Sequence, residues 1–183
     1  MKNNALKSTF LLLFLGAIIL NFSNCNKILD AFDIDASFSK TLTIDVGPDD
    51  ELIFEDEEEI DLSNNEDFNN NKDQIDKFTL KELNYMVEYY EGDPGIYGSG
   101  TVVFLSNGNQ VGDAIAQSDV DFHALSLTAE TVVLPVTENT KDAVAEVLKN
   151  NMKITVAMMG TVTNKPVYVD LKVTAVIKAK VQP

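Results

Sequence analysis

The stretch KITVAMMGTVTNKPVYVDLKVTAVIKAKV, residues 153–181, carries the strongest fold signal in the chain. Successive side chains of a β-strand point to opposite faces, so apolar residues at every second position predict a strand with one buried face and one wet face. Asn164 and Pro166 mark a turn, and the alternation on either side of it predicts two strands paired as an antiparallel hairpin. In the second strand the apolar positions are Val167, Val169, Leu171, Val173, Ala175, Ile177, Ala179 and Val181.

Shorter segments with the same period precede this predicted hairpin. They cover residues 34–46, 78–89, 101–105, 111–116 and 122–136. The first is one half-buried strand or a strand broken near Ser39 and Lys40. The second slips phase between Leu80 and Leu83, which indicates a β-bulge. The pair Asn107-Gly108 favours a tight hairpin turn between the third and fourth.

One segment has helical periodicity. In residues 138–151, Asn139 or Thr140 is a candidate N-cap, and the apolar residues of one face are Ala143, Val144, Val147 and Leu148. With about seven to nine short strands elsewhere, the sequence predicts a mainly β protein: an antiparallel immunoglobulin-like β-sandwich with one short helix near residues 140–150. A length of 183 residues suits a single such domain, which we place at residues 34–183.

Composition narrows the possible functions. The chain has 29 acidic residues against 14 basic residues, all of them lysine, and a net charge of -15. Without arginine and with this charge, nucleic acids and anionic membrane surfaces are disfavoured as partners. The single Cys allows no internal disulfide, and one His makes a site that needs two imidazoles improbable.

The N-terminal 24 residues have the anatomy of a signal peptide. Lys2 and Lys7 form a positive start, residues 10–20 are free of charge, and a short polar patch precedes Cys25. The apolar run is shorter than the roughly 20 residues that a membrane-spanning helix needs. Cleavage is therefore favoured over an uncleaved anchor, which stays open as an alternative.

The segment FSNC, residues 22–25, resembles the end of a bacterial lipoprotein signal. In such signals a lipobox precedes a cysteine that is diacylated on sulfur and becomes the new N-terminus. Ser23 fits the pattern, whereas Phe22 and Asn24 stand where Leu and Gly or Ala are usual. The resemblance implies lipidation at Cys25, a lipidated tether over residues 25–33, and attachment to the bacterial cell envelope. Asn26 would permit transport to an outer membrane where the cell has one.

Residues 49–76 form the most acidic segment, with 13 acidic residues in 28 positions. Like charges at this density repel, so we expect a solvated loop. The alternative is a divalent-cation-dependent binder or hydrolase built on this segment, because carboxylates suit hard cations. The spacing does not match an EF-hand, since no glycine occupies its sixth position.

Candidate functional side chains outside this segment are few. His123 reads as an exposed strand residue rather than a metal ligand, and no serine has the context of an activated nucleophile. Tyr85, Tyr89, Tyr90 and Tyr97 could pack within the sandwich, or they could stack on sugars or anchor a protein partner from an exposed sheet face. The sequence predicts no catalytic residue, no metal site and no cofactor.

The order of elements in residues 120–181 gives a second resemblance. A strand, the segment TVVLPVT, a short helix, a strand with Gly160, a turn with Pro166 and a terminal strand are similar in layout to the second half of a late-embryogenesis-abundant type 2 domain. That domain is a small β-sandwich. The resemblance implies a binding or protective module without catalysis.

Overall fold

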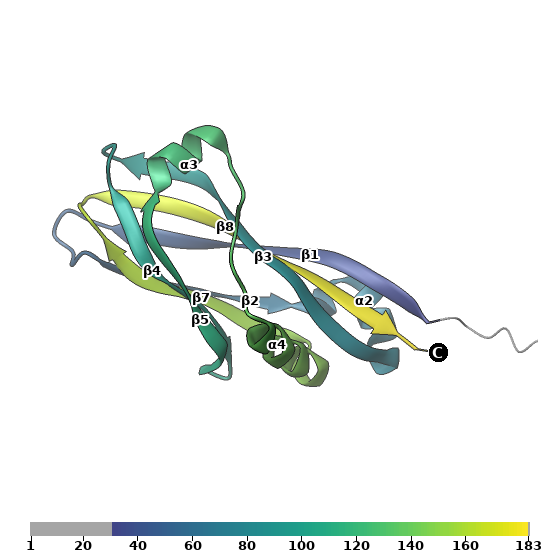
Figure 1. Cartoon of the computed structure of the whole chain (residues 1–183). Helices are drawn as coiled ribbons and strands as arrows, with labels where there is room; N and C mark the ends of the chain where they lie inside the picture. The colour runs from purple at the N-terminus through teal and green to yellow at the C-terminus, as the bar shows by residue number, and fades with distance from the viewer. Residues whose placement is uncertain (1–30, 183) are drawn as a thin grey trace, which may run out of the picture. The chain divides into compact units, whose positions relative to one another are not determined.

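Two antiparallel sheets of four strands each make up the part of the chain that the computed structural model describes, residues 31–182 (Figure 1). The predicted signal peptide at 1–24, Cys25 and most of the predicted tether at 25–33 lie outside the described residues. The mainly β sandwich is confirmed. The strands are β1 (Phe32–Val46), β2 (Ile53–Asp61), β3 (Ile75–Gly92), β4 (Tyr97–Ser106), β5 (Asn109–Asp121), β6 (Val132–Val133), β7 (Lys153–Val162) and β8 (Val167–Val181).

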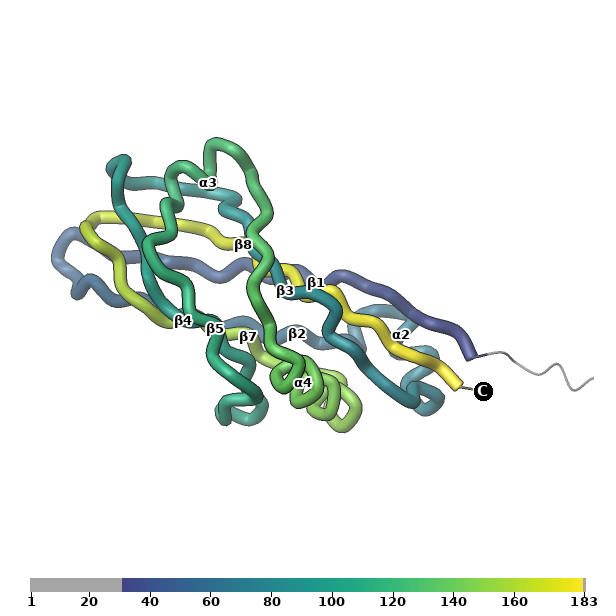
Figure 2. The backbone as a smooth tube through the Cα atoms, in the orientation of Figure 1, coloured from purple at the N-terminus to yellow at the C-terminus, as the bar shows by residue number. Residues whose placement is uncertain are grey.

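The first sheet has the order β1-β8-β3-β6 and the second has the order β2-β7-β4-β5. Among the described strands, β4 and β5 are the one consecutive pair that shares a sheet, and every other connection crosses the sandwich (Figure 2). The predicted hairpin of residues 153–181 is therefore wrong. β7 pairs with β2 and β4, whereas β8 lies between β1 and β3. β7 and β8 each have an apolar face, and these two faces meet across the core instead of lying side by side in one sheet.

The predicted core face of β8 is confirmed at every position. All eight apolar residues, from Val167 to Val181, are buried. β8 is paired along its whole length on both sides, to β1 and to β3. A strand with neighbours on both sides and a covered face loses almost all of its apolar surface to the core, which is the main favourable term in folding.

β1 runs without a break through Ser39 and Lys40. Lys40 occupies an inward-facing position, and its Nζ lies 3.3 Å from Glu58 of β2 instead of in the core. The bulge predicted in β3 is present between Leu80 and Glu82. Positive φ angles at Asn107 and Gly108 confirm the tight β4–β5 turn.

The predicted helix is α4 (Glu138–Asn151), and its buried face includes Val144 and Leu148. Its N-cap is Thr137, whose hydroxyl accepts the Thr140 N–H, rather than Asn139 or Thr140. α4 contacts β3 of one sheet and β5 of the other, so it closes one side of the sandwich.

The strand predicted at 122–136 is wrong in its first half. Residues there form α3 (Phe122–Thr128), capped by the Asp121 carboxylate on the Ala124 N–H.

The acidic loop predicted at residues 49–76 is also wrong for most of its length. The segment contains β2, the 3₁₀ turns η1 (Leu62–Asn64) and η2 (Lys72–Gln74), and α2 (Glu66–Asn71). Four of its apolar side chains, Ile60, Leu62, Phe68 and Ile75, are in the core. Lysines offset part of the repulsion among its carboxylates, since Glu58 pairs with Lys40 and both Glu59 and Asp61 pair with Lys153. A few well-placed apolar residues therefore offset the cost of ordering an acidic chain.

Candidate functional site

The structure does not bring the four candidate tyrosines together on one surface. Tyr85 is 6% exposed and lies between the two sheets, whereas Tyr89 is 49% exposed. The last of three irregularities in β3, between Val87 and Tyr89, changes which face the following residues occupy. Tyr90 is half-buried, and Tyr97 is exposed at the start of β4. The alternation of the sequence had placed Tyr85 and Tyr89 on one face.

Tyr89 instead pairs with Tyr168 of β8. Their ring centroids are 5.8 Å apart at an interplanar angle of 70°. The Tyr89 hydroxyl donates to the Glu91 carboxylate at 3.0 Å, and this hydrogen bond raises the pKa of Tyr89. The sequence placed Tyr168 on the outer face of its strand, but its partner depends on the register between β3 and β8, which no local signal reveals.

A groove of about 420 Å³ adjoins this pair. It lies where the β1–β2, β3–β4 and β7–β8 connections meet, at the end of the sandwich opposite the start of β1 (Figure 1). Its functional groups are the Tyr168 ring and the carboxylates of Asp45, Glu91 and Asp93. We call it the turn groove. Carboxylates accept hydrogen bonds from hydroxyl or ammonium groups, and an aromatic ring packs on an apolar face.

His123 is not an exposed strand residue. It lies half-buried in α3, and its ring centroid is 5.4 Å from that of Tyr90. Burial, followed by the nearby Asp121 and Asp93 carboxylates, raises the pKa of Tyr90. Within residues 31–182 no group of three or more His, Cys, Asp or Glu side chains is arranged to hold a metal ion.

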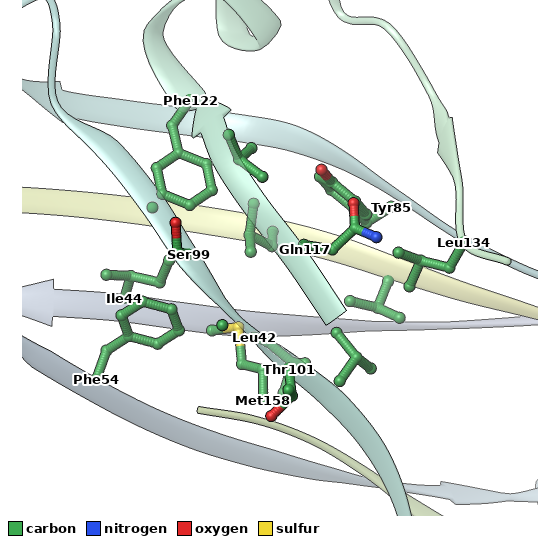
Figure 3. Close-up of a pocket in the computed structure, with 16 residues that line it drawn as sticks. Leu42, Ile44, Phe54, Tyr85, Ser99, Thr101, Gln117, Phe122, Leu134 and Met158 are labelled. Carbon is green, nitrogen blue, oxygen red and sulfur yellow. The ribbon is translucent and has the colours of Figure 1, made fainter. Parts of the chain in front are cut away.

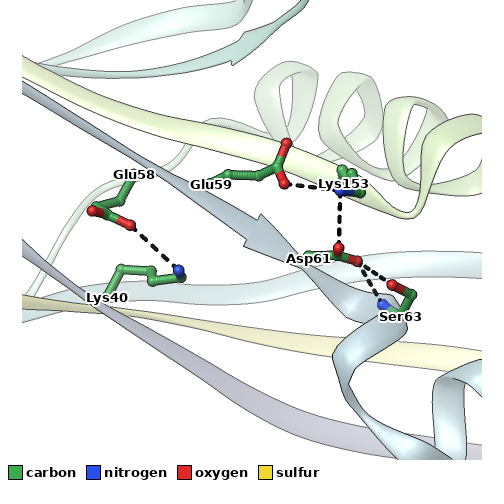
Figure 4. Close-up of polar contacts among 6 residues, drawn as sticks. All are labelled: Lys40, Glu58, Glu59, Asp61, Ser63 and Lys153. Carbon is green, nitrogen blue, oxygen red and sulfur yellow. Dashed lines mark hydrogen bonds and ion pairs between the residues drawn. The ribbon is translucent and has the colours of Figure 1, made fainter.

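The carboxylates of β2 are engaged with groups of this same domain. Lys153 lies 2.9 Å from both Glu59 and Asp61, and Asp61 also accepts hydrogen bonds from Ser63 (Figure 4). Asp56 accepts the backbone N–H of Thr43, at 2.6 Å, from β1. β1 and β2 are edge strands, and Asp56 takes up a backbone N–H of β1 that would otherwise be open to strand pairing with another chain.

The lowered pKa of Asp61 predicts that this residue contributes to stability in a pH-dependent way. The Ser63 hydroxyl and then Lys153 lower the pKa of Asp61, so its stabilising effect is present above the unfolded pKa near 4 and is lost as pH falls through the folded value. Asp61 also caps η1. We expect Asp61→Ala to lower the free energy of unfolding by about 1 kcal/mol at pH 7, and by less at pH 3.

Urea unfolding of both proteins at the two pH values measures this difference. Glu57→Ala is the matched control, because Glu57 is an exposed acid on the same strand. A difference between wild type and Asp61→Ala that is the same at pH 7 and pH 3 would contradict the assignment.

A second hollow lies inside the sandwich. It is a cavity of about 50 Å³, and its lining includes Tyr85, Phe122, Leu134 and Met158 (Figure 3). No residue of the lining is charged. Sequence reasoning could identify Tyr85 as an aromatic residue of β3, but not that its ring borders a space.

No protein-family model matches the chain, and no curated protein matches it. One similar solved structure, the cryo-EM structure of mud crab tombus-like virus, has 12% identity and a TM-score of 0.38 over 91% of this chain and 98% of the other. Another, Desmodium yellow mottle tymovirus, has 10% identity and a TM-score of 0.34 over 82% and 89%. Both resemblances drawn from the sequence stay predictions.

None of the helices in residues 31–182 combines the length and apolar character needed to span a bilayer.

Proposed function

We propose that this protein is a lipid-anchored lipoprotein of the bacterial cell envelope whose β-sandwich has a binding or structural role and no enzymatic activity. The observation that carries the proposal is the uncharged run at residues 10–20, followed by the sole cysteine, Cys25, just before the sandwich. Acyl chains on Cys25 would insert in the membrane, where two or more chains hold a domain stably. Asn26 favours the outer membrane where the cell has one.

The short segment between Cys25 and the first strand supports one orientation of the sandwich relative to the membrane. β1 begins at Phe32, seven residues after Cys25, and seven residues span at most about 25 Å. The end of the sandwich with the start of β1 and the end of β8 would therefore face the bilayer. β1 is 15 residues long, or about 50 Å, so the turn groove at its other end would be presented away from the membrane.

The binding role is supported by the turn groove and the Tyr89–Tyr168 pair beside it. A partner that reaches the envelope surface would meet an exposed aromatic ring and three carboxylates. A glycan offers hydroxyls for the carboxylates and an apolar ring face for a tyrosine, and a protein partner offers lysines and apolar side chains. Tyr97 is exposed as well, on β4.

No specific observation favours the alternative of a divalent-cation-dependent binder or hydrolase on residues 49–76. Lysines and a backbone N–H engage several carboxylates of β2. A bound cation would have to compete with these contacts.

The anchor is tested by expressing the full chain in a bacterial host beside Cys25→Ala. We expect wild type in the membrane fraction, with an intact mass equal to residues 25–183 plus two or three acyl chains. Cys25→Ala should retain residues 1–24, because processing requires the lipidated cysteine in proteins of this class. An unmodified Cys25 in wild type would overturn the lipoprotein proposal.

A further inference from the structure

The two sheets of the sandwich have very different outer faces. On β8, a central strand of the first sheet, the charged residues at outward positions are Asp170, Lys172, Lys178 and Lys180. Over residues 97–106 and 153–162, the two central strands of the second sheet, Lys153 is the one charged residue. The other outward residues are Tyr97, Ser99, Thr101, Val103 and Leu105 of β4, and Thr155, Ala157, Met159 and Thr161 of β7. We call these nine residues the uncharged face.

The alternation of β4 and β7 determines which residues belong to the uncharged face. Phe104, Val156 and Met158 are part of the hydrophobic core, so their chain neighbours point to the opposite side of the sheet. Val103 and Ala157, which pair with each other, are each 4% exposed, yet neither belongs to the core. The middle of the uncharged face is therefore formed by apolar side chains that other residues of the same sheet surround.

The composition of this face is that of a protein interface. Interface cores are depleted in charged residues and enriched in tyrosine and methionine, and a contiguous apolar patch with a polar rim marks an interaction site. Tyr97 is 38% exposed and Met159 is 46% exposed. The rim lies on the edge strand β2, where Glu55, Glu57 and Glu59 occupy the outward positions.

We propose that the uncharged face binds the same face of a second copy of this chain. A twofold axis parallel to the strands would place β7 of each copy over β4 of the other, and β2 over β5. Such an axis keeps every residue at its own height along the strands. Met159 pairs with Thr101 inside one sheet, so Met159 of each copy would lie over Thr101 of the other.

The charges of the rim favour this axis. Glu55 pairs with Met159, and Thr101 pairs with Ala116 of β5, so Glu55 would lie over the uncharged Ala116 of the second copy. An axis across the strands would instead place β2 over β2, where the glutamates of the two copies would repel each other. The axis along the strands also puts the start of β1 at the same end in both copies. Two anchored copies could therefore associate on one membrane, although the interaction does not depend on the anchor.

The area of the face suits a weak dimer. Strands of ten residues, as in β4 and β7, extend about 33 Å, and four strands cover about 19 Å, which gives about 600 Å² per copy. The total of about 1,200 Å² is at the lower limit for specific interfaces. We therefore expect a dissociation constant in the micromolar range. Because both copies are acidic, higher salt should screen their repulsion and strengthen the dimer.

The test is sedimentation of residues 26–183 at increasing protein concentration, at low and at high NaCl. This segment contains every residue of the hydrophobic core and lacks Cys25, so the result is independent of the lipoprotein proposal. We expect a monomer–dimer equilibrium that salt shifts toward the dimer. The chemical shift of the Met159 methyl group should change with concentration. That of Met86 should not, because Met86 pairs with Lys172 on the outer face of the first sheet.

Met159→Glu is the decisive variant, and Leu127→Glu is its matched control. Both replace an exposed apolar side chain and add the same charge, but Leu127, 74% exposed, lies on α3 outside the uncharged face. In Met159→Glu each dimer would bury two unpaired carboxylates, so its dissociation constant should be at least about tenfold higher than that of Leu127→Glu. Thermal unfolding of both variants checks that they fold.

Three results would overturn the proposal. The first is a monomer at every concentration, which would leave the face to a different protein. The second is a dimer that Met159→Glu and Leu127→Glu weaken equally, or in which the Met159 methyl shift stays constant. The third is an association that salt weakens, because attraction between opposite charges would then hold the copies together instead of the uncharged face.

Discussion

Replacing Phe68 with alanine is expected to lower the free energy of unfolding by about 3–5 kcal/mol. Phe68 is 0% exposed although it belongs to the acidic segment. Its ring packs edge-on against Phe38 of β1, with centroids 5.6 Å apart, and parallel to Phe78 of β3, at 5.9 Å. Truncation would remove the ring from the core and leave a cavity beside both partners.

Helix α2 is six residues long, too short to be stable by itself. The Asn65 side chain accepts the N–H groups of Asp67 and Phe68, which sets the start of the helix. Burial of Phe68 then supplies most of the energy that holds it in place. Losing this one side chain should release much of the segment between β2 and β3.

Chemical denaturation measures the effect, and Asn69→Ala is the matched control. Asn69 is exposed on the same helix, so its replacement should change the free energy of unfolding by no more than about 0.5 kcal/mol. If Phe68→Ala changed the free energy of unfolding as little as Asn69→Ala does, the acidic segment would be the solvated loop that its composition suggests.

The second large effect is expected at Gly160, near the C-terminal end of β7. A Cβ there would lie 2.3 Å from the Ser99 carbonyl oxygen and 2.7 Å from both the Gly100 Cα and the Phe54 ring. Two of these neighbours are backbone atoms of β4, so they cannot rotate away. Gly160→Ala would separate two central strands of the second sheet, at a cost of about 3 kcal/mol, the upper part of the range for overpacked cores.

Gly108→Ala is the control for this prediction. A Cβ on Gly108 meets nothing within 4 Å, but its φ of +75° disfavours any residue other than glycine. Its replacement should cost about 1 kcal/mol through backbone strain alone. Thermal unfolding of both variants separates the steric cost from the conformational one. A Gly160→Ala variant as stable as wild type would contradict the close approach of β4 and β7.

The candidate sites were only partly predictable. Aromatic residues at 85, 89, 90 and 97 are visible in the sequence, but the irregularity after Val87 separates Tyr85 from Tyr89. Tyr168 lines the turn groove because it pairs with Glu91, which lies 77 residues earlier in the chain. The cavity lies where Leu42 and Leu171 of the first sheet face Val102 of β4 in the second. Such neighbours come from pairing between distant segments, which no short window of sequence contains.

The sequence by itself determined the features that are local to the backbone. The period of two in β8 specifies its buried face, the phase slip specifies the bulge near Leu80, and Asn107-Gly108 specifies a tight turn, because each depends on the geometry of a few consecutive residues. Only the tertiary structure decided which strands share a sheet. The apolar face of a strand is buried equally well whether the next strand pairs with it in the same sheet or crosses to the opposite sheet. The alternation of apolar and polar residues is therefore the same in the two cases. Burial of Phe68 between β1 and β3 likewise ordered an acidic segment whose charges alone favour a loop.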